Sequence, residues 1–387
     1  MSSATNIRAK KPGRIVFLSA AEASGDIHCA NLIKVLREKD SGIVFVGIGG
    51  ERMAQAGCEL LENSVSRAAM TYKAFGQAGF FFRLLRRVRA YLRNNPVDLV
   101  IVCDSPAFNF HVAKAAKKAG IQTLFYVAPQ LWAWAPWRIR KLRRFCNRLA
   151  CILPFEEDWF TQRGVKAEFV GNPLMDGLVI EQNSTRRYEG FDVADARVAL
   201  MPGSRQAEIE SLWHPMQQIA CYLKDKQPGM KFVAVAADQQ KLEHLKAEQI
   251  EGFDCNYTIS RVFESALEAD LSLVASGSAT LQVAAAGCPM VIMYQSNRLA
   301  WQLLGRFLVT SRYLSLVNIL AGKELVPEFM PYFRSIEPIR EKCEELLSDP
   351  DELRHLSSTL VELVKPLATQ SAGERVSRLV LDMLRPQ

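Results

Sequence analysis

The sequence predicts an α/β protein built from two consecutive halves, each with its own parallel sheet. Short apolar strands alternate with loops and helical segments from residue 14 to about residue 170, and the same alternation restarts at residue 198. Residues 180–196, between the two halves, are polar and lack a hydrophobic period, as is typical of a linker. At 387 residues the chain is also long enough for two or three domains of ordinary size.

Composition narrows the class of protein. Lysine and arginine exceed aspartate and glutamate by 48 to 41, which suits an anionic partner without requiring nucleic acid. The charged N-terminus is not followed by the apolar segment of a signal peptide, and no apolar run approaches the roughly 20 residues that span a bilayer. Nine scattered cysteines without a C-x-x-C pair indicate a reducing compartment. We therefore expect a cytoplasmic protein whose membrane contact is at most peripheral.

In the first half, the strand-like run at 14–19 leads through AAEASGD into a helical pattern, and a second strand follows at 43–47. No G-x-G-x-x-G signature follows the first strand, which disfavours a nicotinamide enzyme. The apolar run at 99–103 ends at Asp104, and further strands are predicted at 123–127, 150–153 and 167–170. Because ligands collect at the carboxyl ends of buried parallel strands, Asp104 stands where chemistry is expected.

In the second half, the strand at 198–201 runs into a Pro-Gly-Ser-Arg turn, and a helix is predicted from Gln206 onward. Gly203 permits backbone geometries closed to other residues, and the amides of the helix start together with Arg205 suit a phosphate. The alternative is an ordinary strand-to-helix connection with a solvated arginine. Further strands are predicted at 231–236, 271–275 and 290–294. The small residues at 275–286 either admit a phosphate or sugar to the backbone, or simply pack a helix on the sheet.

One amphipathic segment, between Phe75 and Arg93, has the composition of a helix lying on an anionic membrane surface. Its predicted membrane-contact residues are Phe81, Leu84, Leu85, Val88 and Leu92 on the apolar face, with Arg86 and Arg87 beside them. The alternative is a helix packed on the first sheet with solvated arginines. A second basic aromatic segment, at 132–144, either extends this surface or binds an RNA backbone. The modules of RNA-binding proteins are absent, so we expect no nucleic-acid partner.

Eight short motifs, in order along the chain, together resemble the lipid-A-disaccharide synthase family of GT-B glycosyltransferases. They are AEASGD at 21–26, CDSPAFN at 103–109, VAPQLWAW at 127–134, PFE at 154–156, GNPLMD at 171–176, PGSRQAEI at 202–209, ASGSATLQ at 275–282 and SLVNILAGKELVPEF at 315–329. The resemblance implies the GT-B fold, with two Rossmann-like parallel-sheet halves facing across a cleft, followed by C-terminal helices. The expected segments are a polar tail (1–13), an acceptor and membrane-facing domain (14–180), a linker (181–196), a UDP-sugar-binding domain (197–336) and C-terminal helices (337–387).

The resemblance also implies an activity. The family transfers diacylglucosamine from UDP, with inversion, to the 6-hydroxyl of diacylglucosamine 1-phosphate, on the cytoplasmic face of the bacterial inner membrane. The implied partners are this UDP-linked donor, this phosphorylated acceptor, an anionic membrane surface and a second copy of the chain in a homodimer. No metal and no cofactor are implied.

Matching motif positions imply the site residues. The catalytic candidates are Asp104 as base for the acceptor hydroxyl, Arg205 for the departing pyrophosphate, and Glu22. The UDP-binding candidates are Gly203, Ser204, Arg205, Glu208, Ser276, Gly277, Ser278, Gln282 and Asn318. The acceptor or loop candidates are Ser24, Gly25, Asp26 and Asn109. For Asp26 and Ser24, capping of the loop is the alternative role, and for Glu208 capping of the following helix.

This sequence departs from the family pattern at several positions. Gln282 stands where such enzymes usually have a ribose-binding glutamate, Ala107 replaces a second acid, and Gly79 lies near a usual glutamate. A glutamine still hydrogen-bonds a hydroxyl, but its neutral carbonyl is a weaker acceptor. Two alternatives therefore stay open: a homologue acting on another UDP-sugar and acceptor, such as an epimerase, and a homologue that binds nucleotide or lipid with weakened turnover.

Overall fold

The computed structural model describes residues 13–65, 74–180, 188–296, 298, 301, 309, 311–368 and 371–385. The chain divides into two compact units. The first contains the described residues up to Asp176 together with 371–385, and the second contains the described residues from Gly177 to 368. The expected tail, apart from Gly13, and the linker residues 181–187 lie outside the described part of the chain.

The first unit is organised around a seven-stranded parallel sheet in the order β3-β2-β1-β4-β5-β6-β7. Its strands are β1 (Ile15–Ala20), β2 (Val44–Gly49), β3 (Glu59–Asn63), β4 (Leu99–Cys103), β5 (Gln122–Tyr126), β6 (Arg148–Cys151) and β7 (Ala167–Phe169). The order reverses between β1 and β4, which pair in register so that Ala20 lies opposite Cys103. The loops that follow these two strands therefore emerge side by side.

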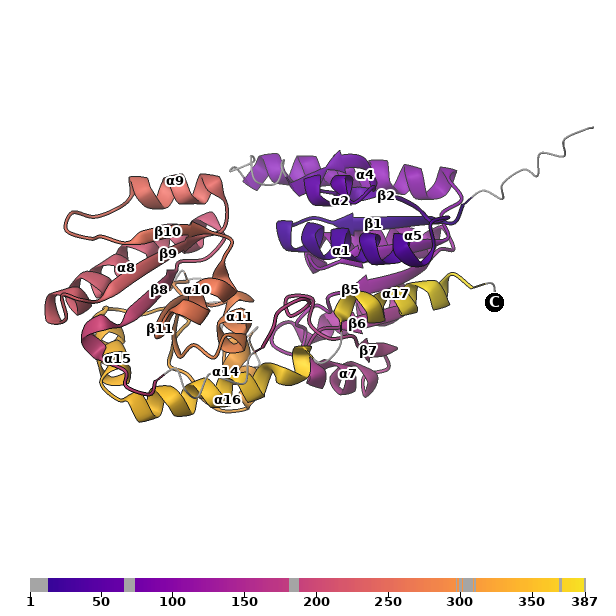
Figure 1. Ribbon diagram of the computed structural model, residues 1–387. Coiled ribbons are helices and arrows are strands. Elements are labelled where there is room, and N and C mark those ends of the chain that lie inside the picture. Colours follow the sequence, from indigo (N-terminus) through magenta and orange to yellow (C-terminus); the bar gives the residue numbers. More distant parts are fainter. Residues whose placement is uncertain are drawn as a thin grey trace, which may run out of the picture. The chain divides into compact units, whose positions relative to one another are not determined.

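Helices cover both faces of this sheet (Figure 1). One face carries α1 (Ala23–Lys39), α2 (Glu51–Gln55) and α17 (Ala372–Met383), and the other carries α4 (Ala74–Asn94), α5 (Pro106–Lys118) and α6 (Ile139–Phe145). A short 3-10 turn, η1 (Pro136–Arg138), precedes α6, and α7 (Pro154–Thr161) lies between β6 and β7. Two apolar cores, one on each face, bury the central strand β4 completely, as its uninterrupted apolar run predicts.

The last helix, α17, belongs to the first unit although the rest of the C-terminal segment belongs to the second. Asp176 holds its N-terminus, because the carboxylate accepts the backbone N–H of Ala372 at 2.8 Å and of Gly373 at 3.0 Å. A carboxylate at this end of a helix satisfies free amides and complements the helix dipole. The sequence predicts 337–387 as one group of helices, whereas the structure separates α17 from the others.

The second unit repeats the same plan with a six-stranded parallel sheet in the order β10-β9-β8-β11-β12-β13. Its strands are β8 (Arg197–Met201), β9 (Lys231–Ala236), β10 (Asn256–Ile259), β11 (Leu271–Ala275), β12 (Met290–Met293) and β13 (Glu328–Phe329). Here the order reverses between β8 and β11, where Met201 lies opposite Val274. The two predicted parallel-sheet halves are thus confirmed.

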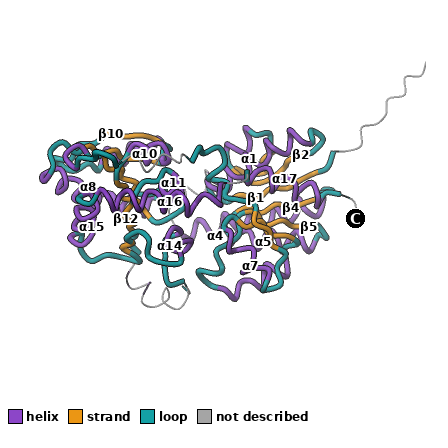
Figure 2. Tube along the Cα trace, turned by 60° about the horizontal axis from the view of Figure 1, so that its bottom comes forward, coloured by secondary structure: helices purple, strands orange, loops and turns teal. Residues whose placement is uncertain are grey.

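The described part of the second unit contains the α-helices α8 (Gln206–Lys226), α9 (Gln239–Ala247), α10 (Val262–Glu268), α11 (Ala279–Ala285), α14 (Leu316–Ala321), α15 (Glu337–Leu347) and α16 (Pro350–Ala368). Figure 2 shows helices lying alongside the strands of this unit, with β10 at its rim. The segment from Tyr188 to Ala196, predicted as part of the linker, packs on this unit. Tyr188 is 1% exposed within its core, and the short 3-10 turn η3 (Val193–Asp195) leads into β8.

Three strands at sheet edges escape sequence prediction. β3, β10 and β13 stand at the ends of their sheets, and their side chains are mostly half-buried. An edge strand is covered less completely than a central one, so its sequence carries no uninterrupted apolar run. The central strands, which position the candidate site, follow the prediction to within about two residues at their ends.

Candidate functional site

Four of the predicted motifs follow the two central strands of each sheet. AEASGD follows β1 and CDSPAFN begins at the end of β4, where the first sheet reverses its order. PGSR follows β8 and ASGSATLQ begins at the end of β11, at the corresponding point of the second sheet. In open parallel sheets ligands bind beside the carboxyl ends of strands at this switch point. Each unit therefore places its two predicted loops where its topology favours a ligand.

Asp104 ends the central strand of the first unit in an unusual backbone conformation. Asp104 and Ser105 have φ angles of 52° and 42°, in the left-handed region that non-glycine residues seldom adopt. The Asp104 carboxylate accepts the N–H of Ser105 at 2.7 Å and the hydroxyl of Ser24 at 3.2 Å, and it is half-buried. Its position at a strand end, with partial exposure, is compatible with the predicted role as a base, which stays a prediction.

Asn109 lies directly behind this loop. It is fully buried, its Nδ2 donates to the carbonyl oxygens of Cys103 and Asp104 at 2.8 Å each, and its Oδ1 accepts the Ser19 hydroxyl at 2.6 Å. Asn109 was predicted to contact the acceptor or its loop. The structure places it with the loop.

In the first loop, Glu22 and Asp26 have different surroundings. Glu22 is exposed and accepts the Ser105 hydroxyl at 2.9 Å, which joins the two loops of the first unit. Asp26 is 4% exposed, and its carboxylate accepts the N–H groups of Gly50, Arg52 and Met53 at 2.7–3.1 Å. Asp26 therefore caps the start of α2.

The predicted contact of Asp26 with an acceptor is thus wrong, and the capping alternative holds, although the cap is on α2 and not on its own loop. Gly25 is buried, and a Cβ atom at this position would lie only 3.3 Å from the Ala20 side chain and 3.4 Å from the carbonyl oxygen of Cys103. It allows α1 to approach the ends of β1 and β4. Ser24 remains exposed beside Asp104.

The Pro-Gly-Ser-Arg turn of the second unit is built around Glu208. Its Oε2 accepts the N–H groups of Ser204 and Arg205, at 3.1 Å each, and its Oε1 accepts from the Arg205 guanidinium at 2.9 Å. Gly203 has φ 108°, and a side chain there would lie 2.5 Å from Glu208 Oε2. Both Gly203 and Glu208 are thus needed for the turn, while the Arg205 side chain is 71% exposed.

The second loop of this unit is open to solvent. Gly277 and Ser278 are exposed, Ser276 is half-buried, and Thr280 closes the turn by donating its hydroxyl to the Gly277 carbonyl at 2.7 Å. Gln282 lies half-buried on α11, and no described residue forms a hydrogen bond with its side chain. These positions permit the predicted contacts with a nucleotide, which stay predictions.

Asn318 is fully buried, and its amide is already saturated. It donates to the Val326 carbonyl at 2.8 Å and to Glu328 at 2.9 Å, and it accepts the N–H groups of Leu325 and Val326 at 2.8 and 3.0 Å. Direct nucleotide contact by Asn318 is not compatible with this arrangement. Glu328, which also accepts the N–H groups of Leu314 and Ser315, completes a polar cluster that the sequence did not predict.

The predicted membrane helix is largely a core helix. On α4, Leu84, Leu85, Val88 and Leu92 are at most 8% exposed and pack on the first sheet, and Phe81 packs beside them. The prediction that this apolar face contacts a membrane is therefore wrong, since a single helical stripe has already found its partner in the sheet. The predicted membrane contact of Arg86 and Arg87, on the polar face, stays a prediction. Arg86 is exposed, and Arg87 forms an ion pair with Glu62. The side chain of Phe75 lies outside the described residues.

A buried carboxylate that the sequence did not single out is Glu156, from the PFE motif. It accepts the indole N–H of Trp132 at 2.9 Å and the N–H groups of Ile152 and Leu153 at 3.1 and 3.0 Å. Burial raises the pKa of Glu156 to about 7, against the opposing effect of these three donors. Proline followed by glutamate at the third helical position is a capping pattern and was the available signal.

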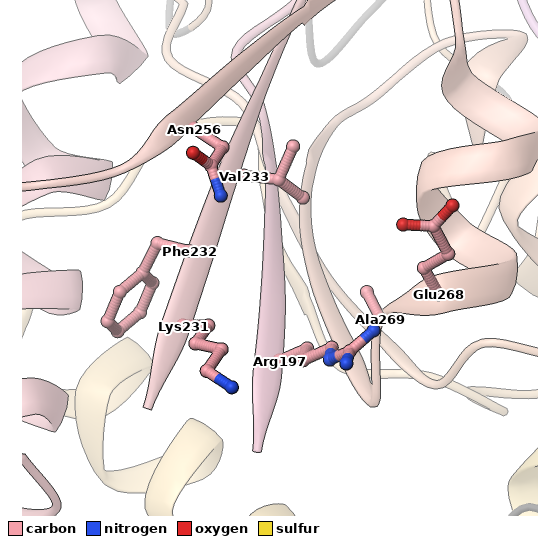
Figure 3. A pocket seen from close by; sticks show the side chains of 7 residues that line it. All are labelled: Arg197, Lys231, Phe232, Val233, Asn256, Glu268 and Ala269. Atoms are coloured by element: carbon pink, nitrogen blue, oxygen red, sulfur yellow. The ribbon is translucent and has the colours of Figure 1, made fainter. Parts of the chain in front are cut away.

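A hollow of about 310 Å³ in the second unit lies away from the candidate loops. Arg197 and Lys231 line it at the starts of β8 and β9, with Asn256 and Glu268 nearby (Figure 3). The Pro-Gly-Ser-Arg turn follows the opposite end of β8. This hollow is therefore separate from the switch point of the second sheet.

Comparison with known proteins identifies a family profile and full-length relatives that match this chain. Residues 16–381 match the sequence profile of the lipid-A-disaccharide synthetase family. A lipid-A-disaccharide synthase from Geobacter metallireducens is 33% identical over 380 residues, covering 96% of this chain and 98% of the relative. Another from Trichlorobacter lovleyi is 34% identical over 384 residues, covering 97% and 98%.

Solved structures support the fold. S. aureus MnaA, in a co-structure with UDP, is 12% identical with a TM-score of 0.64, covering 96% of this chain and 97% of its own. MurG from Acinetobacter baumannii is 15% identical with a TM-score of 0.55, covering 95% and 99%. At these identities the likeness concerns the fold alone. From the family profile and the full-length relatives together, the chain belongs to the lipid-A-disaccharide synthetase family of glycosyltransferases.

Proposed function

We propose that the protein transfers 2,3-diacylglucosamine from UDP to the 6-hydroxyl of 2,3-diacylglucosamine 1-phosphate, forming lipid A disaccharide 1-phosphate and UDP. The observation that carries this proposal is the placement of the four loops. In each unit, two family motifs follow the pair of strands at which the sheet reverses its order. Membership of the family supplies the substrates, and the topology supports a ligand-binding role for the residues that match its motifs.

Each unit carries residues to which we assign a different role in the reaction. In an inverting displacement the acceptor oxygen forms a bond to the donor's anomeric carbon while the bond from that carbon to UDP breaks. Asp104 takes the proton of the attacking hydroxyl, since a carboxylate at a strand end is a suitable general base. Arg205 and the start of α8 stabilise the negative charge that develops on the departing UDP. Glu22 supports the loop that carries Asp104 through the Ser105 hydroxyl.

We further propose a peripheral association with the cytoplasmic face of the inner membrane, through a surface other than the apolar face of α4. Residues 134–145, which contain η1 and α6, carry two exposed tryptophans, Trp134 before η1 and Trp137 within it. The segment also carries a hollow lined by the basic side chains Arg140, Arg143 and Arg144. Aromatic rings together with a basic cluster suit the interface of an anionic bilayer. Among the described residues, none of the helices is long and apolar enough to cross a membrane.

The decisive experiment supplies the purified protein with the UDP-linked donor and the 1-phosphate acceptor. We expect release of UDP together with a disaccharide 1-phosphate, detected by mass spectrometry, above a control without enzyme. Intact UDP binding without product would contradict the transferase and favour the homologue with weakened turnover. Product from UDP-N-acetylglucosamine and a soluble acceptor, but none from the lipid substrates, would favour the alternative substrate pair.

The membrane proposal has its own test. Vesicles containing anionic phospholipid are expected to sediment the wild type, while a variant with Arg140, Arg143 and Arg144 changed to glutamine remains in the supernatant. The matched control changes Lys224, Lys226 and Lys342 of the second unit to glutamine, which removes the same charge. Equal sedimentation of both variants would contradict the assignment to α6. The homodimer implied by the family stays a prediction, which light scattering of the purified protein addresses.

A further inference from the structure

The loop between β4 and α5 holds two consecutive non-glycine residues in the left-handed region, Asp104 and Ser105. Such a conformation costs on the order of 1–3 kcal/mol per residue and persists only where the surroundings impose it. Asp104 supports its own conformation locally, because its carboxylate accepts the Ser105 N–H at 2.7 Å, but serine is not among the residue types that tolerate this geometry readily. Further contacts that hold the backbone of the two residues come from outside them.

Asn109 supplies those contacts. Its two amide hydrogens go to the carbonyl oxygens of Cys103 and Asp104, the peptide groups on either side of the Asp104 Cα. Its own backbone N–H donates to the Ser105 carbonyl at 3.0 Å. One side chain and its backbone thus fix three successive carbonyl groups, and no solvent reaches it.

The orientation of the Asn109 amide is fixed in turn from the neighbouring strand. Ser19 of β1, also fully buried, donates its hydroxyl to Oδ1 at 2.6 Å. This bond leaves Nδ2 facing the loop, because the amide cannot rotate without losing both sets of partners. Asn109 thereby connects β1, β4 and α5 at the switch point of the first sheet.

We propose that Asn109 is a positioning residue, which sets the direction of the Asp104 carboxylate by imposing the left-handed backbone beneath it. This role rests on the proposed function of Asp104 as the base. Asn109 touches no substrate, since it is completely buried. A misplacement of about 1 Å at a reacting group lowers a rate by about 10²-fold, so the clamp acts on turnover more than on substrate binding.

The test replaces Asn109 with aspartate, which keeps the shape but removes the two-hydrogen donor. We expect Asn109→Asp to lower kcat by about 10²-fold, with KM for donor and acceptor changed less than threefold. The matched control is Asn172→Asp, an equally buried asparagine of the same unit that accepts only the Leu174 N–H among the described residues. We expect this control to retain kcat within about threefold.

A milder variant, Ser19→Ala, removes the hydroxyl that Asn109 Oδ1 accepts and leaves the Nδ2 contacts in place, and we expect it to lower kcat about fivefold. Hydrogen exchange gives a readout besides activity: the N–H groups of Ser105 and Asn109 should lose protection in Asn109→Asp, with the strands of the sheet unchanged. The positioning role would be overturned if Asn172→Asp lost as much kcat as Asn109→Asp, or if Ser19→Ala kept the kcat of the wild type. A wild type that forms no disaccharide but shows the exchange pattern would instead overturn the proposed function and leave the clamp standing.

Discussion

The β4–α5 loop of the first unit and the β8–α8 turn of the second solve the same problem in two ways. Each leads from a central, largely buried strand into a helix, and each contains residues with positive φ. The second unit uses Gly203, for which φ 108° carries no side-chain penalty. The first unit uses Asp104 and Ser105, and Asn109 holds them from behind. Gly203 adopts its positive φ without a steric penalty, and Glu208 then holds the N–H groups of the turn, whereas the two side-chain-bearing residues of the first loop have their carbonyl groups held by Asn109.

The carboxylates of the two loops differ correspondingly. Glu208 is committed to the turn's own N–H groups and to Arg205, and its side chain is only 10% exposed. Asp104 is half-buried and has two short contacts, with Ser105 N–H and the Ser24 hydroxyl. The contrast is compatible with the proposed role of Asp104 as the base, while Glu208 is part of the scaffold that holds the exposed Arg205 side chain.

The largest effect that we predict tests whether Asp104 can accept a proton from the reacting hydroxyl. We predict that Asp104→Asn lowers kcat by about 10³-fold, within the range for loss of a general base, because an amide cannot take the proton. The Kd for UDP should change less than twofold. Steady-state kinetics and calorimetry with UDP measure the two quantities. Similar losses in kcat and in UDP affinity would assign Asp104 to binding.

How far the sequence predicts these two loops depends on the range of the interactions. The run LVIVC ending at Asp104 and the strand ending at PGSR are local patterns, so both loops were found. The clamp was not, because Ser19 and Asn109 are 90 residues apart and meet only through strand pairing. For the same reason Asp26 was taken for an acceptor contact, since its partners at 50–53 belong to another helix.

The burial of α4 was likewise not predictable from its own pattern. A stripe of apolar residues opposite arginines is equally consistent with a membrane surface and with a sheet. The choice depends on whether the sheet leaves a face uncovered, which no single helix encodes. The bonding of Asn318 to Glu328 and to residues 325 and 326 is closer in sequence, but it depends on a loop without periodic pattern.

Two histidines, one on α1 of the first unit and one on α8 of the second, extend the comparison to acid stability. In α1, burial lowers the pKa of His28 to about 4, against the raising effect of Asp176, whereas His214 of α8 is exposed. The unfolded chain binds this proton below about pH 6.5, whereas the native state binds it only below about pH 4. The free energy of unfolding is therefore unaffected by His28 above pH 6.5 and decreases as the pH falls below that value. At pH 5 the loss is about 2 kcal/mol.

We therefore predict that wild type loses about 2 kcal/mol more stability than His28→Gln between pH 8 and pH 5. Urea unfolding, monitored by hydrogen exchange in α1 and α8 separately, assigns the effect to the first unit. The control His214→Gln should follow the wild type at both pH values. An identical acid response in His28→Gln and wild type would remove His28 as the cause.

The smallest effect sharpens the role of Glu208. If UDP phosphates are to use the N–H groups of Ser204 and Arg205, they approach a carboxylate that already occupies both donors. Glutamine retains an acceptor oxygen for the turn but removes the charge, so we predict that Glu208→Gln binds UDP about fivefold more tightly. A repulsion of about 1 kcal/mol between partly screened charges corresponds to this change.

Glu210→Gln, at an exposed position on the same helix, should leave the Kd unchanged. Calorimetry at two salt concentrations should show the gain shrinking as salt rises. Weaker binding by Glu208→Gln would instead mean that the carboxylate mainly supports UDP binding by orienting Arg205. Glutamate forms an ion pair with that guanidinium, and glutamine does not.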